Sequence, residues 1–255
     1  MKRRTVEGKR RGVLENNRKD ILLRPIEYSF ISLLSNKIKV LIVGGGRAGF
    51  IKAKTLSNNG CRVKVISKNF SKEFEELKKL SNVQLIKDEY KKDYISENHL
   101  IIIAVEDETT NEIIRKHCDE QCKLYLDCSH FERGLFVVPC QRSSKTATFG
   151  INTKGGSPKT AIYLAEEIKD NLIKKDSFIE YSYKLRNIIN KSEDKATIMD
   201  FVATEDFYFF YNKNKHKIIL EMFFGGNYFE VNSSHKKEYF STNSNRFSNK
   251  ENRGR

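Results

Sequence analysis

Residues 40–54 read Val-Leu-Ile-Val-Gly-Gly-Gly-Arg-Ala-Gly-Phe-Ile-Lys-Ala-Lys. A continuous aliphatic run of this kind is typical of a parallel strand buried on both faces. The glycines that follow have the spacing Gly44-x-Gly46-x-x-Gly49, and we expect a helix over residues 50–59. In this pattern one glycine makes the turn, one lets the backbone approach a pyrophosphate, and one packs the helix against the strand. The predicted dinucleotide-binding residues of the turn are Gly44, Gly45, Gly46, Arg47, Ala48 and Gly49.

Strands and helices alternate along the chain after this turn. Alternation at this spacing predicts an α/β fold with a parallel sheet and helices on both faces. After residue 139 the pattern changes to a strand-like stretch at 146–152, a tight loop, and helix from residue 159 onward. Residues 176–222 are also predicted to be helical. The further strands are expected at 62–67, 83–86, 100–105 and 124–126, with helices at 72–80 and 109–118.

The net charge of +14 is concentrated at the two ends of the 255-residue chain. Residues 1–24 hold nine Lys and Arg against three acids, and residues 232–255 hold six against two. With little apolar periodicity, the segments 1–25 and 231–255 are predicted to be disordered tails. Basic tails attract any polyanion, so they support at most a non-specific contact with nucleic acid. Nucleic acid is therefore not the predicted partner.

Composition also restricts the compartment. No apolar run approaches the roughly 20 residues that a membrane span needs, and the basic start lacks the apolar core of a secretory signal. Five cysteines at irregular spacing do not make a disulfide framework. We expect a cytoplasmic protein with no membrane partner. No structural metal site is predicted, because His117, Cys118 and Cys122 lack a matching second pair of ligands; Cys128 and His130 remain open as contacts for a labile metal ion.

Polar residues stand at the carboxyl ends of three predicted strands, where open α/β sheets bind ligands. Ser67 and Lys68 occupy the place of the carboxylate that binds the ribose hydroxyls of NAD, which leaves NAD and NADP both open. Asp107 and Asn111 either contact the cofactor or start a helix. Asp127 ends the fifth strand, and a carboxylate shielded from water there is a candidate proton acceptor.

Three ordered segments resemble the precorrin-2 dehydrogenase family, also known as the sirohaem synthase N-terminal domain. The first is residues 40–54, and the second is residues 103–111, Ile-Ala-Val-Glu-Asp-Glu-Thr-Thr-Asn. The third joins Phe-Val-Val-Pro at 136–139 to Ile-Asn-Thr-Lys-Gly-Gly-Ser-Pro at 151–158. Their order and spacing hold over residues 28–225.

The resemblance implies a Rossmann-type NAD(P)-binding domain, a small dimerisation domain and a C-terminal helical domain. We assign these to residues 26–138, 139–168 and 169–230. It also implies a homodimer that oxidises precorrin-2 to sirohydrochlorin with NAD⁺, and some members of the family insert Fe²⁺ as ferrochelatases. The key aspartate of the family falls on Asp127. The resemblance adds Val105 to the expected cofactor contacts, and Lys52, Thr153, Lys154 and Ser157 to the expected contacts with the polycarboxylate substrate.

The sequence departs from the family pattern at three places. After the glycines, Lys52 is kept but the neighbouring arginine is replaced by Ile51. Val105 stands where the family has a threonine, and residues 128–134 replace an Asp-Pro loop. Two alternatives therefore stay open: a dinucleotide-binding regulatory or scaffold protein without this activity, and a nucleic-acid-associated protein that uses its basic tails.

Overall fold

The computed structural model describes residues 27–225, so the predicted tails at 1–25 and 231–255 lie outside the described residues. The described chain forms two compact units. The first contains residues 27–140 and 152–161, and the second contains residues 141–151 and 162–225. The chain passes between the two units at the start of β6, at the end of β7 and after the first residues of the long helix α5.

The first unit is built on a parallel five-stranded sheet in the order β3-β2-β1-β4-β5. β1 is central, and its residues 40–43 are at most 3% exposed because β2 and β4 pair with both of its edges. This confirms the predicted parallel α/β sheet. The strands are β1 (Lys39–Val43), β2 (Arg62–Ser67), β3 (Val83–Lys87), β4 (Leu100–Ile103) and β5 (Leu124–Asp127).

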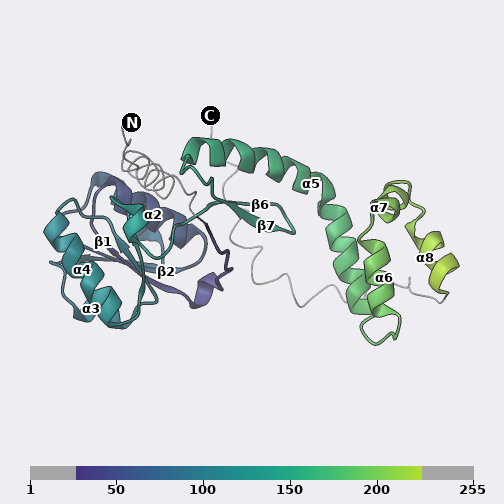
Figure 1. Cartoon of the computed structure of the whole chain (residues 1–255), viewed down its shortest axis with the longest axis horizontal. Coiled ribbons are helices and arrows are strands. Elements are labelled where there is room, and N and C mark those ends of the chain that lie inside the picture. The colour runs from purple at the N-terminus through teal and green to yellow at the C-terminus, as the bar shows by residue number, and fades with distance from the viewer. Residues whose placement is uncertain (1–26, 226–255) are drawn as a thin grey trace, which may run out of the picture. The chain divides into compact units, whose positions relative to one another are not determined.

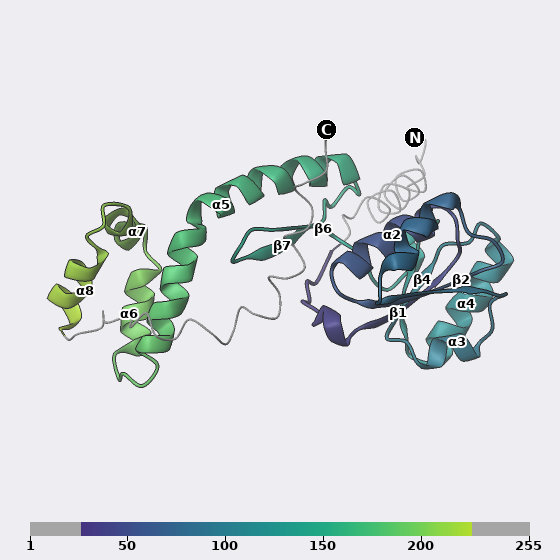
Figure 2. The same cartoon turned by 180° about the vertical axis from the view of Figure 1, so that it is seen from behind.

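Helices cover both faces of this sheet (Figures 1 and 2). Alternate residues of a strand point to opposite faces, so Val40 and Ile42 pack against α2 (Arg47–Asn58) and the 3₁₀ helix η2 (Lys72–Lys79). Leu41 and Val43 pack on the other side. The helices of that side are α3 (Asp93–Ser96) and α4 (Glu108–Glu120), and the short 3₁₀ helices η1 (Ser35–Lys37) and η3 (Phe131–Arg133) lie in loops.

Two predicted helices differ from the structure. Residues 72–79 form a 3₁₀ helix, and its buried residues Phe74 and Leu77 are three apart, which suits three residues per turn. α2 begins at Arg47, three residues earlier than expected, with Gly46 as its N-cap in an extended conformation. Gly49 therefore lies inside the first turn of the helix and not in the loop before it.

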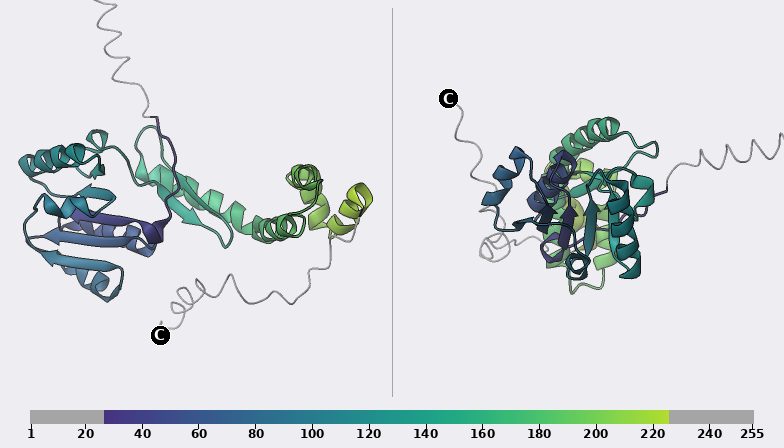
Figure 3. Two further views of the ribbon diagram at one scale, coloured as in Figure 1. Left: turned by 90° about the horizontal axis from the view of Figure 1, so that it is seen from below. Right: turned by 90° about the vertical axis from the view of Figure 1, so that its left-hand side faces the viewer.

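The second unit combines a hairpin with helices (Figure 3). The predicted strand at 146–152 is observed as β7, and its partner β6 was not predicted. Leu185 and Ile189, at the C-terminal end of α5, form a core with apolar side chains of the three shorter helices. No helix within residues 27–225 has the length and apolar character needed to cross a membrane. The elements are β6 (Cys140–Ser143), β7 (Thr148–Ile151), α5 (Pro158–Ile188), α6 (Lys195–Val202), α7 (Glu205–Asn212) and α8 (His216–Phe224).

Asp176 of α5 fastens the β6–β7 turn to the helix. Its Oδ1 accepts hydrogen bonds from the hydroxyls of Ser144 (2.7 Å) and Thr146 (2.5 Å) and from the Thr146 N–H (3.0 Å), while Oδ2 accepts one from the Lys145 N–H (3.1 Å). These donors, the Thr146 hydroxyl foremost, lower the pKa of Asp176 to about 2. All of them favour the ionised carboxylate.

We expect Asp176→Asn to destabilise the second unit, because an amide presents a donor to groups that are all donors. The depressed pKa means that the stabilisation is complete above the unfolded pKa of an aspartate, about 3.9, and is lost as the pH falls toward 2. Urea unfolding at pH 7 and at pH 3 measures this. Asp170→Asn, an exposed carboxylate on the same helix, is the control. Equal unfolding midpoints for the two variants at pH 7 would contradict the assignment.

Candidate cofactor-binding and active site

The segment from the end of β1 into the first turn of α2 contains two glycines, Gly44 and Gly49, at which any side chain would collide with the backbone. Gly44 has φ +122°, and a Cβ on it would lie 2.1 Å from the carbonyl oxygen of Ala104. A Cβ on Gly49 would lie 2.1 Å from the carbonyl oxygen of Gly44. Around Gly46, in contrast, no atom lies within 4 Å of the Cβ position. The segment is therefore tightly packed against the backbone at Gly44 and Gly49 and open at Gly46, so a pyrophosphate can approach the backbone there.

The N-terminus of α2 opens into this space. The first intrahelical bond is donated by Phe50 to the carbonyl of Gly46, so the N–H groups of residues 47–49 have no partner within the helix. Such N–H groups, together with the helix dipole, attract phosphate. The predicted residues Gly44–Gly49 thus form one cradle, and this cradle fits the pyrophosphate of a dinucleotide.

Ser67 and Lys68 lie beside that cradle, at the end of β2. The Cβ position of Gly45 is 2.8 Å from the Ser67 side chain. The Ser67 hydroxyl donates to the carbonyl of Asn69 (2.7 Å), and Lys68 forms an ion pair with Glu89 (2.9 Å). Both partners of this ion pair are 70% exposed, so solvent screens it. Glu89, which the sequence reasoning did not single out, brings a carboxylate to the edge where the second strand has none.

Val105, Asp107 and Asn111 lie where β4 passes into α4. Asp107 is the N-cap of α4: its Oδ2 accepts from the N–H (2.8 Å) and the hydroxyl (2.5 Å) of Thr110, which lowers the pKa of Asp107. This is the helix-starting role among the two that the sequence left open. Asn111 is 1% exposed and donates to the carbonyl of Val105 (3.3 Å), but its Oδ1 has no partner in the described structure. A buried oxygen without a donor at a ligand-binding edge favours a missing ligand group.

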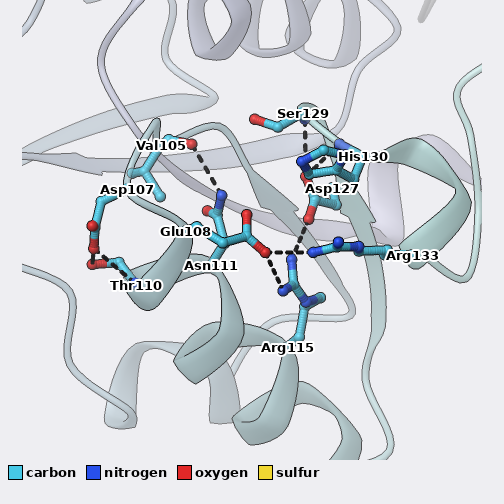
Figure 4. A network of polar contacts seen from close by, with 10 residues as sticks. All are labelled: Val105, Asp107, Glu108, Thr110, Asn111, Arg115, Asp127, Ser129, His130 and Arg133. Carbon is cyan, nitrogen blue, oxygen red and sulfur yellow. Dashed lines mark hydrogen bonds and ion pairs between the residues drawn. The ribbon is translucent and has the colours of Figure 1, made fainter.

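Asp127 ends β5 and is fully buried (Figure 4). Its Oδ1 accepts from the backbone N–H groups of Ser129 (2.9 Å) and His130 (3.0 Å), and its Oδ2 accepts from Nη1 of Arg115 at 2.5 Å. All three partners are N–H donors, so both oxygens of the Asp127 carboxylate act as hydrogen-bond acceptors. The loop after β5 is thereby shaped around this carboxylate.

Lys52 lies on α2, near the thiol of Cys128 that follows Asp127. Burial raises the pKa of Cys128, and the positive charge of Lys52 acts against that rise. Lys52 therefore lies near the residue that follows Asp127 on the α2 face of the sheet, whereas the Asp127 side chain lies on the α4 face with Arg115. Among residues 27–225 no group of three or more His, Cys, Asp and Glu side chains is arranged to hold a metal ion.

Thr153, Lys154 and Ser157 lie in the turn that precedes α5. The Ser157 N–H donates to the Thr153 hydroxyl (2.7 Å), and the Ser157 and Thr160 hydroxyls are 2.7 Å apart, so these groups shape the start of the helix. The Cβ position of Gly156 is 3.8 Å from the ring of Phe131. The 153–157 turn consequently touches the loop that follows Asp127, which places the predicted substrate residues near the predicted catalytic one.

The sequence analysis did not identify Arg115, the ion-pair partner of Asp127, or the residues Glu108 and Arg133 that extend the network. Arg115 of α4 also donates to Glu108 (2.8 Å), and Glu108 accepts from Arg133 (2.5 Å). Glu108 and Arg115 are seven residues apart, two turns along one face of a helix. Arg115 also borders the buried positions Asn111, Ile114 and Cys118. A charged residue on the buried face of a predicted helix was the available signal.

The parallel sheet, its order and the glycine cradle define a Rossmann-type NAD(P)-binding domain. Residues 31–140 match a protein family described as "Putative NAD(P)-binding". The chain is 29% identical to the "Putative precorrin-2 dehydrogenase" of Methanocaldococcus jannaschii over 171 residues, which are 63% of this chain and 82% of that protein. These findings confirm the resemblance that the three sequence segments indicated.

Two further similarities are of different extent. The siroheme synthase of Psychrobacter cryohalolentis is 32% identical over 135 residues, but the chain spans only 25% of its length. The solved structure titled "SirC, precorrin-2 dehydrogenase" superposes with a TM-score of 0.58, covering 76% of this chain and 98% of that one at 20% identity. At that identity the likeness establishes the fold, including a helical C-terminal part after the Rossmann-type domain.

Two glycine substitutions separate binding from folding. We expect Gly46→Ala to leave the free energy of unfolding within about 1 kcal/mol of the wild type, because its Cβ meets no protein atom. The methyl group would occupy the space of the pyrophosphate, so NAD⁺ binding should weaken about tenfold or more, ~1.4 kcal/mol. Gly49→Ala should instead lower the unfolding free energy by about 1–3 kcal/mol through overpacking. Calorimetric titration measures the affinity for NAD⁺, and urea unfolding measures the free energy of unfolding. If Gly46→Ala bound NAD⁺ with wild-type affinity, residues 44–49 would not be the pyrophosphate site.

Proposed function

We propose that the chain is an NAD-dependent precorrin-2 dehydrogenase, which oxidises precorrin-2 to sirohydrochlorin in sirohaem synthesis. The observation that carries this proposal is the edge of one sheet that presents both a dinucleotide cradle and a buried carboxylate, Asp127. The similarity to a relative named as a precorrin-2 dehydrogenase, over 82% of that protein, supports the choice of substrate.

Dehydrogenation removes two electrons and one proton as hydride, and a second proton separately. Bound NAD⁺ supplies the hydride acceptor. Residues 44–49 would hold its pyrophosphate at the start of α2, and the unpartnered Asn111 Oδ1 would accept a hydrogen bond from a hydroxyl or N–H group of the dinucleotide. NAD⁺ is preferred over NADP⁺ because Lys68 is already paired with Glu89, whose carboxylate repels a 2′-phosphate.

Asp127 takes the second proton. The two oxygens of a carboxylate offer about four acceptor positions, and three N–H donors occupy three of them. The remaining acceptor position on the Asp127 carboxylate can take a proton from the macrocycle.

The substrate is a polycarboxylate, and its acidic groups are recognised by positive charge and by N–H groups. Lys52 of α2 lies near Cys128, the residue after Asp127, and Lys154 lies in the turn before α5 with the Thr153 and Ser157 hydroxyls. The N-terminus of α5 follows directly and adds its dipole. Fe²⁺ insertion into sirohydrochlorin is a proposed second activity, with Asp127 as the acceptor of pyrrole protons.

We also propose a homodimer, since α5 exposes a series of apolar side chains in the second unit. Leu164 is 37% exposed, and Ile168, four residues later on the same face of the helix, is 41% exposed. Large exposed apolar patches of this kind mark interaction surfaces. A second copy of the chain is the occupant that the resemblance to the dehydrogenase family favours.

Ile168→Glu should therefore convert the dimer to a monomer, because a buried unpaired carboxylate opposes association. Sedimentation velocity at micromolar protein measures the change in mass. Lys174→Glu, at an exposed position of the same helix, is the control and should stay dimeric. A monomeric wild type, or an unchanged mass for Ile168→Glu, would contradict the proposal.

The reaction itself is tested by anaerobic incubation with precorrin-2 and NAD⁺, following NADH and the tetrapyrrole spectrum. We expect turnover by the wild type and a loss of at least about 100-fold in kcat for Asp127→Asn, the usual contribution of a positioned base. Asp93→Asn, an exposed carboxylate of the same unit, should keep full activity.

Each result has a distinct meaning. NAD⁺ binding and the melting temperature of Asp127→Asn show whether its loss of turnover reflects chemistry or folding. Fe²⁺ added to the sirohydrochlorin formed tests the second activity. A wild type that binds NAD⁺ tightly but turns over no precorrin-2 would reject this substrate and favour the dinucleotide-binding regulatory or scaffold protein.

A further inference from the structure

Asp127 is a buried charge with one positive partner in direct contact. Its side chain is 0% exposed, and the Arg115 side chain is 12% exposed. The two backbone donors, Ser129 and His130, supply dipoles but no charge. A buried carboxylate without a counter-charge becomes protonated rather than staying ionised. Among the described contacts of Asp127, the positive charge that balances this buried carboxylate is therefore that of Arg115.

Arg115 is held in place by the outer half of a four-membered network (Figure 4). Its Nη1 bonds to Asp127 and its Nη2 to Glu108, so the planar guanidinium bridges two carboxylates. Glu108 also accepts from Arg133, which belongs to η3 in the loop after β5. Glu108 and Arg133 are 44% and 49% exposed, so their pair is screened and contributes little by itself. The strong, desolvated contact of the network is between Arg115 and Asp127.

We propose that Arg115 is a positioning residue of this enzyme, which keeps Asp127 ionised and fixes the direction of its free acceptor position. The inference rests on the proposed function. Arg115 is set on α4, the helix that Asp107 caps and that carries Asn111, the proposed cofactor contact, near its N-terminus. The same helix thus aligns the dinucleotide and the carboxylate that takes the proton.

The loop of residues 128–134 explains why the charge must come from the helix. The loop is fastened to β4 by the Cys128 N–H (2.9 Å to the Ile103 carbonyl) and returns to β5 through the Leu135 N–H (2.8 Å to the Tyr125 carbonyl). The loop gives Asp127 only the two main-chain N–H groups of Ser129 and His130, which carry no net charge. The positive charge in contact with Asp127 is that of Arg115 on α4.

Substitution of Arg115 tests the proposal through the pH dependence of kcat. Arg115→Gln should lower kcat at least about tenfold and move the acidic limb of the pH profile upward, because the carboxylate loses its counter-charge. Arg115→Lys keeps the charge, and its acidic limb should lie closer to the wild type. Lys116→Gln removes a charge from the exposed neighbouring position and should change neither quantity.

Other charged and titratable groups near Asp127 can also contribute to the pH dependence of kcat. They are Arg115 and Glu108 from α4, Lys52 from α2, Tyr125 from β5, and Cys128, His130 and Arg133 from the loop and η3.

A thermodynamic cycle gives a readout that needs no substrate. Arg115→Gln leaves the buried Asp127 carboxyl without its counter-charge, and Asp127→Asn leaves Arg115 paired with Glu108 alone, whereas the double variant removes both members of the buried pair. We expect the double variant to melt at a higher temperature than the sum of the two single shifts predicts. Additive shifts, or an unchanged kcat and pH profile in Arg115→Gln, would overturn the positioning role.

The outcome for the proposed function is separate. Turnover by the wild type with normal kinetics in Arg115→Gln removes only the role of Arg115. Absence of turnover by the wild type removes the proposed reaction, and with it any positioning role in that reaction, whatever the cycle shows. NAD⁺ affinity measured for all variants reports whether α4 keeps its place, and we expect it unchanged within about twofold in Arg115→Gln.

Discussion

The close approach of α2 to the end of β1 is the constraint on which the first unit depends. A Cβ on Gly49 would lie 2.1 Å from the carbonyl oxygen of Gly44, so the helix can pass the end of the strand at this distance only with glycine at position 49. The approach directs the free N–H groups of α2 to the carboxyl edge of the sheet. It also lets Ala53 and Leu56 close the core over Val40 and Ile42. Binding geometry and core packing thus come from one backbone contact.

Strand order concentrates the remaining chemistry at that edge. β1 pairs with β2 on one side and β4 on the other, and β4 pairs with β5. Residues that follow these strands are therefore neighbours in space, although Gly44 and Asp127 are more than eighty positions apart. The register places Val43 opposite Ile103 and Ile103 opposite Asp127, which sets the cradle two strands from the carboxylate. All strands of a parallel sheet end at the same edge, so the residues that follow them gather there.

Much of this arrangement followed from the sequence, because it depends on local patterns. The aliphatic run at 40–43 and the glycine spacing predicted the strand, the turn and the helix, and the position of Asp127 at a strand end was enough to propose it. What the sequence could not provide was contact between distant side chains. In the sequence, Arg115 is one of several charged residues of a predicted helix. Its contact with Asp127 is visible only in the structure, where β5 lies beside α4. The 3₁₀ form of residues 72–79 escaped for a similar reason: Phe74 and Leu77 are compatible with either helix type, and packing on the sheet decides between them.

The buried ion pair also gives a physical reason for the departures from the family pattern around Asp127. A carboxylate at a sheet edge needs donors, and here the backbone of Ser129 and His130 and the Arg115 guanidinium provide them. A loop that carries its own anchor, Arg133 on Glu108, can vary in sequence without changing those donors, since two of them are main-chain N–H groups and the third is on α4. Replacement of residues 128–134 is then compatible with an unchanged environment for Asp127. The identity of residue 115, rather than that of the loop, is what the carboxylate depends on.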